Sequence, residues 1–127
     1  KLWDYRKDYD SVWGIRKLNQ RDSRVRTVLT FFNIFFILVL FQKCFNDPNC
    51  AFKLFHRDKL LEIIDSIQPH PIMTTTKIAI RAKQNKLKIK EIYVDFMKRS
   101  SGKGTISHIP AIFQGIKEML KFKIKHV

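Results

Sequence analysis

Cysteine and histidine are scarce in this chain and are not spaced for metal binding. A disulfide could close the short loop between the only cysteines, Cys44 and Cys50, but nothing marks a secreted protein, so we expect two reduced thiols. The histidines are scattered and show no zinc-ligand spacing with the cysteines; they are His56, His70, His108 and His126. The composition therefore argues against a disulfide-rich domain and against a cysteine–histidine zinc module.

The chain also lacks an apolar run long enough to cross a membrane. Its most hydrophobic tract extends from Val28 to Phe41 and is interrupted by Thr30 and Asn33, whereas a spanning helix needs about 20 apolar residues. We expect either a buried helix or one that lies at a membrane interface, and we favour burial of at least half of the tract in protein. The tract is flanked by the cations Arg21, Arg24, Arg26 and Lys43.

Acidic residues are few relative to basic ones. The 127 residues include 11 Asp and Glu against 25 Lys and Arg, a net charge of +14, so we expect an anionic partner. Nucleic acid, an anionic membrane surface and a phosphorylated small molecule all fit this charge. The hydrophobic content of 45% predicts a packed core. No signal peptide is recognisable, and the charged, aromatic start suggests a chain that begins partway through a longer protein.

The periodicity of apolar residues predicts a single α/β unit with few strands and flanking helices, and no repeat or linker divides residues 1–127. Strands are expected over residues 8–16, where Gly14 permits a close approach, and over 51–56 and 88–96. Helices are expected over 24–43 and 73–85, from an N-cap at Asp58, and from Pro110. The helix that begins at Asp58 has the predicted apolar set Leu60, Ile63, Ile64 and Ile67. The helix that begins at Pro110 has the predicted apolar set Ile109, Ile112, Phe113, Ile116, Met119 and Leu120.

The segment from Glu91 to Thr105 joins a strand pattern to a basic loop. Apolar residues alternate with polar ones along the strand, and Arg99 then leads into the sequence Ser-Ser-Gly-Lys-Gly-Thr. Backbone N–H groups near Gly102 can approach an anion closely, Lys103 adds a positive charge, and Arg99 can grip an anion with two hydrogen bonds. The same composition is typical of a solvated turn, so both interpretations stay open.

Five motifs between about Asp8 and Leu120 follow one another in a specific order. They are residues 9–16 (YDSVWGIR), 26–33 (Arg-x-x-x-Thr-x-x-Asn), 47–55 (DPNCAFKLF), 75–82 (TTKIAIRA), and 90–94 with 99–105 (KEIYV and Arg-x-x-Gly-Lys-x-Thr). In order and spacing they resemble the middle and late parts of family 2 glycosyltransferases. The resemblance is closest to the group that acts on polyprenyl phosphates, the dolichol-phosphate mannose synthases and their relatives.

The resemblance implies a GT-A-type nucleotide-diphospho-sugar transferase fold, of which this chain would be the C-terminal, acceptor-side half. In the family, the first half holds the sugar nucleotide, and an Asp-x-Asp motif that closes this half holds a divalent metal. Mg²⁺ or Mn²⁺ would therefore be bound upstream of this chain. The sequence Asp8-Tyr9-Asp10 has the same pattern, but it precedes the strand where the family carries Tyr-Asp-x-Val, so we interpret it as the start of a surface strand.

The resemblance also implies a set of phosphate-binding positions. Guanidinium groups suit this role because they stay charged and grip phosphate in a fork. Asp47 matches an aspartate that either orients substrate or caps its own turn. The alternative is that Arg16 is a solvent-exposed arginine at a strand end and Arg26 a solvent-exposed arginine at a helix start. The matched positions are Arg16, Arg26, Arg99, Gly102 and Lys103, with Arg24 close enough to replace Arg26.

Three departures from the family pattern bear on activity. Ala51 replaces a glycine, Lys77 replaces the acid of Thr-Thr-Glu, and Gly104-Thr105 replaces Ser-Lys. Lys77 reverses a charge that could face the site. If that acid contributes to catalysis, the activity of this chain is in doubt.

The expected function is transfer of a sugar from a nucleotide sugar to a polyprenyl (dolichyl or undecaprenyl) phosphate or similar acceptor, with inversion, by a complete enzyme of which this chain is a part. The expected partners are both substrates, a membrane surface contacted from its cytoplasmic face, and a second copy paired through an exposed sheet edge. Two alternatives remain open. One is a non-catalytic basic module that binds nucleic acid, and the other is an inactive, truncated relative of the transferases.

Overall fold

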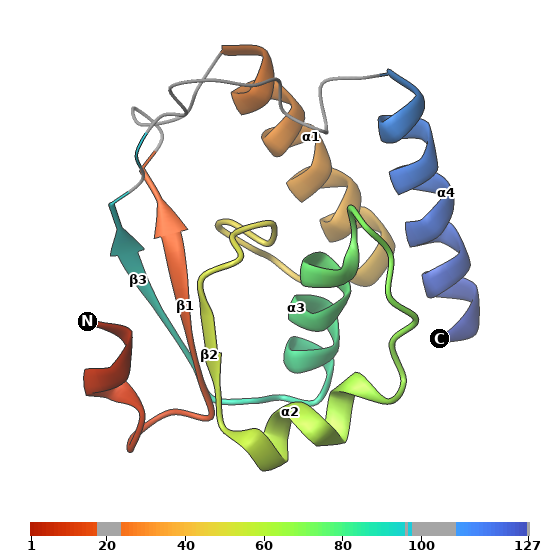
Figure 1. The fold of residues 1–127 in the computed structure, drawn as a ribbon. Helices are drawn as coiled ribbons and strands as arrows, with labels where there is room; N and C mark the ends of the chain where they lie inside the picture. Colours follow the sequence, from red (N-terminus) through yellow and green to blue (C-terminus); the bar gives the residue numbers. More distant parts are fainter. Residues whose placement is uncertain (18–23, 96, 98–108, 127) are drawn as a thin grey trace.

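A three-stranded mixed sheet forms the centre of the computed structural model, which describes residues 1–17, 24–95, 97 and 109–126 (Figure 1). The strands β1 (Ser11–Arg16), β2 (Lys53–Phe55) and β3 (Ile89–Val94) lie in the order β2-β1-β3. β1 pairs with β2 in antiparallel register, with Ser11 opposite Phe55, and with β3 in parallel register, with Ser11 opposite Ile89. The first four residues of β1 are buried, as expected for a central strand.

Within the described ranges, four α-helices and one short 3-10 helix accompany the sheet. They are η1 (Leu2–Tyr5), α1 (Arg24–Phe41), α2 (Arg57–Ile64), α3 (Thr74–Gln84) and α4 (Ile109–Lys125). The core lies between one face of the sheet and the α-helices, because Trp13 of β1 belongs to the same buried cluster as Ile37, Ile63, Ile80 and Met119 from the four helices. The fold is therefore a mixed α/β arrangement, as the sequence predicts.

Gly14 lies at a crowded point of the sheet. A Cβ atom at this position would lie 3.0 Å from the Cβ atom of Phe52 and 3.0 Å from both methyl groups of Val94. The prediction that Gly14 permits a close approach is confirmed, since its missing side chain lets the flanking chains come together.

Each expected strand and helix is present, with ends that differ by a few residues, but one predicted cap is wrong. α2 begins at Arg57 with His56 as its N-cap residue, and no side chain caps it. Asp58 instead lies in the first turn, where a carboxylate interacts favourably with the helix dipole.

The predicted burial is confirmed for one helix and is wrong in part for another. In the tract from Val28 to Phe41, six of the 14 residues are exposed, six are half-buried, and Ile37 and Phe41 are buried, so the expectation that at least half of the tract is buried in protein is confirmed. In α4 the buried residues are Gly115, Met119 and Phe122, whereas Ile109, Phe113 and Leu120 of the predicted apolar set are exposed. Both helices are apolar on more than one side, and only one side of each contacts the core. Within the described residues, no helix is long and apolar enough to span a membrane.

Candidate functional site

A bidentate ion pair joins Arg16 to Asp47 at the end of the central strand. The Nε and Nη2 atoms of Arg16 donate to the two carboxylate oxygens of Asp47 at 2.7 Å and 2.8 Å. The Asp47 side chain is fully buried, while that of Arg16 is 24% exposed. This fork fixes the plane of the guanidinium group at the edge of the solvent.

Asp47 lies beside β1 at the point where the short strand β2 no longer pairs with it. β2 pairs with β1 only as far as Trp13, and beyond it the N–H of Gly14 donates to the carbonyl of Phe52 at 2.7 Å. The next N–H on the same edge, that of Arg16, donates to a carboxylate oxygen of Asp47 at 3.3 Å. Asp47 therefore continues the ladder of β1 where β2 is not present, in addition to holding the Arg16 side chain.

Two lysines hold the loop that carries Asp47, which we call the 44–50 loop. The Nζ atom of Lys53 donates to the carbonyls of Pro48, at 3.1 Å, and Cys50. The Nζ atom of Lys83 on α3 donates to the carbonyl of Cys44 at 2.6 Å. Burial lowers the pKa of Lys53 to about 8, with a further lowering from Arg16, although Cys50 and Asp47 act in the opposite direction.

Side-chain hydrogen bonds connect the same loop to two more of the sequence motifs. The amide of Asn46 donates to the carboxylate of Glu91 on β3, and the hydroxyl of Thr76 on α3 donates to the side-chain oxygen of Asn49. Segments that are far apart in the sequence thus meet at the 44–50 loop. A cavity of about 370 Å³ lies beside it, lined by Lys43, Lys83, Leu87, Ile89 and Glu91.

The structure brings together Arg16 and Asp47 among the sequence-predicted site residues. Arg24 is exposed at the first residue of α1, and Arg26 lies in the first turn of that helix, with a side chain that is not described. β1 and β3 both end, and α1 and α4 both begin, at the same end of the molecule (Figure 1). The remaining predicted residues, Arg99, Gly102 and Lys103, lie outside the described residues.

Asn33, the last residue of the second motif, carries a buried side-chain nitrogen that has no hydrogen-bond partner within the described part of the chain. Buried polar groups are normally paired, so such a donor merits an explanation. Sequence reasoning placed Asn33 in a motif but gave it no role.

Lys77 does not face the Arg16–Asp47 pair. Its side chain is buried, and its Nζ atom donates to a carboxylate oxygen of Glu118 on α4 and to the carbonyl of Gln68, each at 3.1 Å. The hydrogen bond from Lys77 lowers the pKa of Glu118, and Lys121 acts in the same direction. The reversed charge at position 77 therefore joins α3 to α4, which differs from the expectation that it faces the site.

The residues of the chain do not form a metal site where the structure describes them. Asp10 accepts a hydrogen bond from the backbone N–H of Lys88 at 2.7 Å, at the start of the β1–β3 pairing. No group of three or more His, Cys, Asp or Glu side chains in the described ranges is arranged to hold a metal ion. These residues therefore do not form a site for the Mg²⁺ or Mn²⁺ that the resemblance implies.

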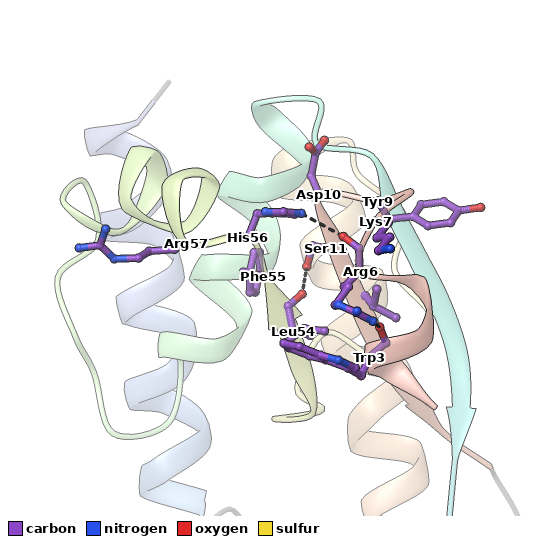
Figure 2. Close-up of a pocket in the computed structure, with 11 residues that line it drawn as sticks. Trp3, Arg6, Lys7, Tyr9, Asp10, Ser11, Leu54, Phe55, His56 and Arg57 are labelled. Carbon is purple, nitrogen blue, oxygen red and sulfur yellow. Dashed lines mark hydrogen bonds between the residues drawn. The ribbon is translucent and has the colours of Figure 1, made fainter.

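A second cavity, which the sequence did not predict, lies where β1 starts and β2 ends. It measures about 380 Å³, and His56 contacts the carbonyl of Arg6 across it at 2.9 Å (Figure 2). The guanidinium of Arg6 lies 4.6 Å from the centre of the Trp3 ring. The only sequence signal for this cavity is the mixture of cations and aromatic residues in the first ten positions. Its lining is Trp3, Arg6, Lys7, Tyr9, Asp10, Ser11, Val12, Leu54, Phe55, His56 and Arg57.

Comparisons with protein-family models, with curated proteins and with solved structures find no match to this chain.

Proposed function

We propose that this chain is the acceptor-side part of a glycosyltransferase that moves a sugar from a nucleotide sugar to a polyprenyl phosphate or a similar lipid phosphate, with inversion. One observation carries the proposal. Four of the five motif segments that resemble family 2 glycosyltransferases, although distant in sequence, contact one another. The first and third motifs meet in the Arg16–Asp47 pair, the third and fourth in the Asn49–Thr76 hydrogen bond, and the first and last in the β1–β3 pairing.

The chemistry of this reaction suits a site built from cations. An oxygen of the acceptor phosphate attacks the anomeric carbon, a new C–O bond forms, and the bond to the nucleotide diphosphate breaks, with its electron pair leaving on the diphosphate. The nucleophile is already an oxyanion, so the protein supplies position and charge neutralisation in place of a strong base. In α/β sheets, ligands bind outside the carboxyl ends of parallel strands, which is where Arg16 lies.

In this proposal Asp47 is a positioning residue for Arg16. Its buried carboxylate fixes the guanidinium in one orientation, so that Arg16 meets the phosphate without a search among rotamers. Phosphate contacts from Arg24, Arg26, Arg99, Gly102 and Lys103 complete the proposed set. Since the described residues do not fit a metal, no step of the proposal runs through a metal held by this chain.

The proposal also requires a donor-binding half that precedes these residues in the complete enzyme. β2 is an edge strand of the described sheet, with β1 on one side only. Unpaired strand edges pair readily with other strands. We propose that an upstream strand pairs there, and that without it the edge favours self-association. The complete enzyme would work at the cytoplasmic face of a membrane, where its lipid acceptor lies.

The nucleic-acid alternative has less support at the two sequence segments that suggest it. Base stacking requires exposed rings next to cations, and the segment Lys121-Phe122-Lys123 has this pattern in sequence. Phe122, however, is 5% exposed and packs against the Phe41 ring, with a centroid distance of 5.9 Å. Phe52 is exposed, but the adjacent Lys53 is bonded to backbone carbonyls.

The test is sugar transfer by the full-length protein from a set of radiolabelled nucleotide sugars to a short, water-soluble prenyl phosphate. We expect Arg16→Ala to lower kcat/KM at least 100-fold, and Asp47→Asn to lower it about 10-fold because the fork loses its charge. Arg57→Ala, which removes an exposed arginine at the other end of the sheet, serves as the control and should retain activity. Absence of transfer with every donor, or full activity of Arg16→Ala, would contradict the proposal. Salt-dependent binding of single-stranded oligonucleotide in place of prenyl phosphate would favour the alternative.

A further inference from the structure

The outer surfaces of α1 and α4 carry a large share of the exposed apolar side chains of the molecule. On α1 these are Val25, Val28, Phe31, Phe32, Phe35, Leu38 and Val39, and on α4 they are Ile109, Phe113, Leu120 and Ile124. Phe35 is 63% exposed and Phe113 is 67% exposed. Monomeric soluble proteins rarely leave contiguous apolar patches of this kind uncovered.

The spacing of these residues places them on one stripe of each helix. On α1 the seven exposed apolar residues from Val25 to Val39 follow spacings of three and four residues, and the buried residues Ile37 and Phe41 lie on the opposite side. On α4 the exposed residues lie within about 60° of one another at 100° per residue, again away from the buried Met119. Each helix therefore has one apolar side toward the core and another toward the exterior.

The two helices form one layer. α1 and α4 run alongside one another from the same end of the molecule (Figure 1), and Phe41 contacts Phe122 between them. Each exposed stripe lies on the side of its helix away from the core that both helices contact, and we take the two stripes together as one surface. We call this surface the α1–α4 face, defined by the eleven residues given above.

Positive charge borders the α1–α4 face. Lys117, Lys121 and Lys125 recur every four residues on α4, next to its apolar stripe, and all three are exposed. Arg24 is exposed at the start of α1. A helix with apolar residues on one side and lysines beside them is typical of segments that lie in the interface of an anionic bilayer, where the lysine stems extend toward the headgroups.

We propose that the α1–α4 face docks on an anionic lipid bilayer. The charge of each candidate partner decides which one suits the α1–α4 face. A second copy of the chain would bring another +14 against the same lysine row, whereas a bilayer that contains acidic lipids offers the opposite charge over the whole face. The inference deepens the proposed function, on which it rests for its biological role, by naming the surface through which the transferase meets the membrane of its acceptor.

The experiment measures binding of the protein to vesicles that contain no prenyl phosphate, composed either of phosphatidylcholine with 30% phosphatidylserine or of phosphatidylcholine alone. We expect the wild-type chain to bind the acidic vesicles and the double variant Phe35→Gln/Phe113→Gln to bind them at least tenfold more weakly. The matched control is Phe52→Gln, which removes a phenylalanine of similar exposure, 66%, from outside the two helices and should change binding less than twofold. Lys117→Gln/Lys125→Gln should reduce the preference for acidic over neutral vesicles severalfold.

Several outcomes would overturn the inference. They are absence of vesicle binding by the wild-type chain, an equal loss in Phe52→Gln, and a dimer in sedimentation velocity that Phe35→Gln/Phe113→Gln dissociates without any vesicle binding. Circular dichroism melting of every variant identifies a loss caused by unfolding, and Phe35→Ser with Phe32→Ser then provides a second substitution of the same face. Retained transfer to the water-soluble acceptor with no vesicle binding would refute this inference and leave the proposed function intact. Vesicle binding without any sugar transfer would refute the proposed function and leave this inference intact.

Discussion

Lys53 combines burial with a positive charge, and its contacts explain how the charge is tolerated. Backbone carbonyls of the 44–50 loop accept its hydrogen bonds, and the Trp13 ring lies 5.4 Å from its Nζ atom. The lysine thus anchors the loop that presents Asp47 to Arg16. Burial nevertheless lowers its pKa to about 8, so holding it charged costs free energy at neutral pH.

This shift predicts how stability changes with pH. Between about pH 8 and pH 10.5 the unfolded chain holds the Lys53 proton while the folded chain releases it, so this residue makes the protein more stable as pH rises. Below pH 8 both states hold the proton and the full cost, roughly 3 kcal/mol at 1.36 kcal/mol per pKa unit, is present. Urea unfolding of wild type and of Lys53→Met at pH 7 and pH 10 measures it. The stability of the wild type relative to the variant should increase with pH; a difference independent of pH would show that the carbonyls of Pro48 and Cys50 compensate the burial.

Between elements, the contact of α3 with α4 depends on a lysine that is almost fully buried. The Lys77 side chain is 3% exposed and that of its partner Glu118 is 25% exposed, whereas the surface pair Lys59–Glu62 has both side chains well exposed. Removing one member of a buried pair leaves an uncompensated charge, while a surface pair contributes little.

We therefore expect Glu118→Gln to lower the free energy of unfolding by about 1 to 3 kcal/mol, and Glu62→Gln by less than about 1 kcal/mol. Urea unfolding of both variants makes the comparison. Equal effects would mean that water reaches Lys77. The combined replacement Lys77→Met/Glu118→Leu should recover much of the loss, since apolar residues can substitute for a buried ion pair.

Replacement of glycine by alanine should have different effects on stability at Gly14 and at Gly115. Gly14→Ala would place a methyl group against Phe52 and Val94 on the neighbouring chains, so we expect a loss of about 1 to 3 kcal/mol. At Gly115 the new methyl group would meet the terminal methyl of Met73, which is the flexible end of a side chain. The helix favours alanine by about 1 kcal/mol, so Gly115→Ala should stay within about 1 kcal/mol of wild type. Thermal or urea unfolding of both variants distinguishes strand crowding from helix crowding, and equal losses would contradict this assignment.

At the scale of the whole molecule, local patterns predicted the elements, but not how they come together. Alternation and three-to-four spacing depend on neighbours in sequence, which is why each strand and helix appears near its expected position. The order β2-β1-β3 and the Arg16–Asp47 pair depend on residues that are far apart, and no periodicity encodes them. The side of a helix that contacts the core is equally hard to predict when apolar residues occur all round it, as on α1. Lys77 was misplaced because the family pattern gave no information on its partner Glu118.

The pairing of β1 with β3 has a consequence for synthesis. The hydrogen bond that starts this pairing joins Asp10 to Lys88, 78 residues later. At about 5 to 20 residues per second, the ribosome takes roughly 4 to 16 s to make that interval. Throughout this time the central strand has no parallel neighbour, and for more than half of it α1 has already been made, with apolar residues on every side. The nascent chain thus spends seconds in a form that attracts chaperones, other nascent chains or a nearby bilayer, and slower elongation prolongs its exposure to each of them.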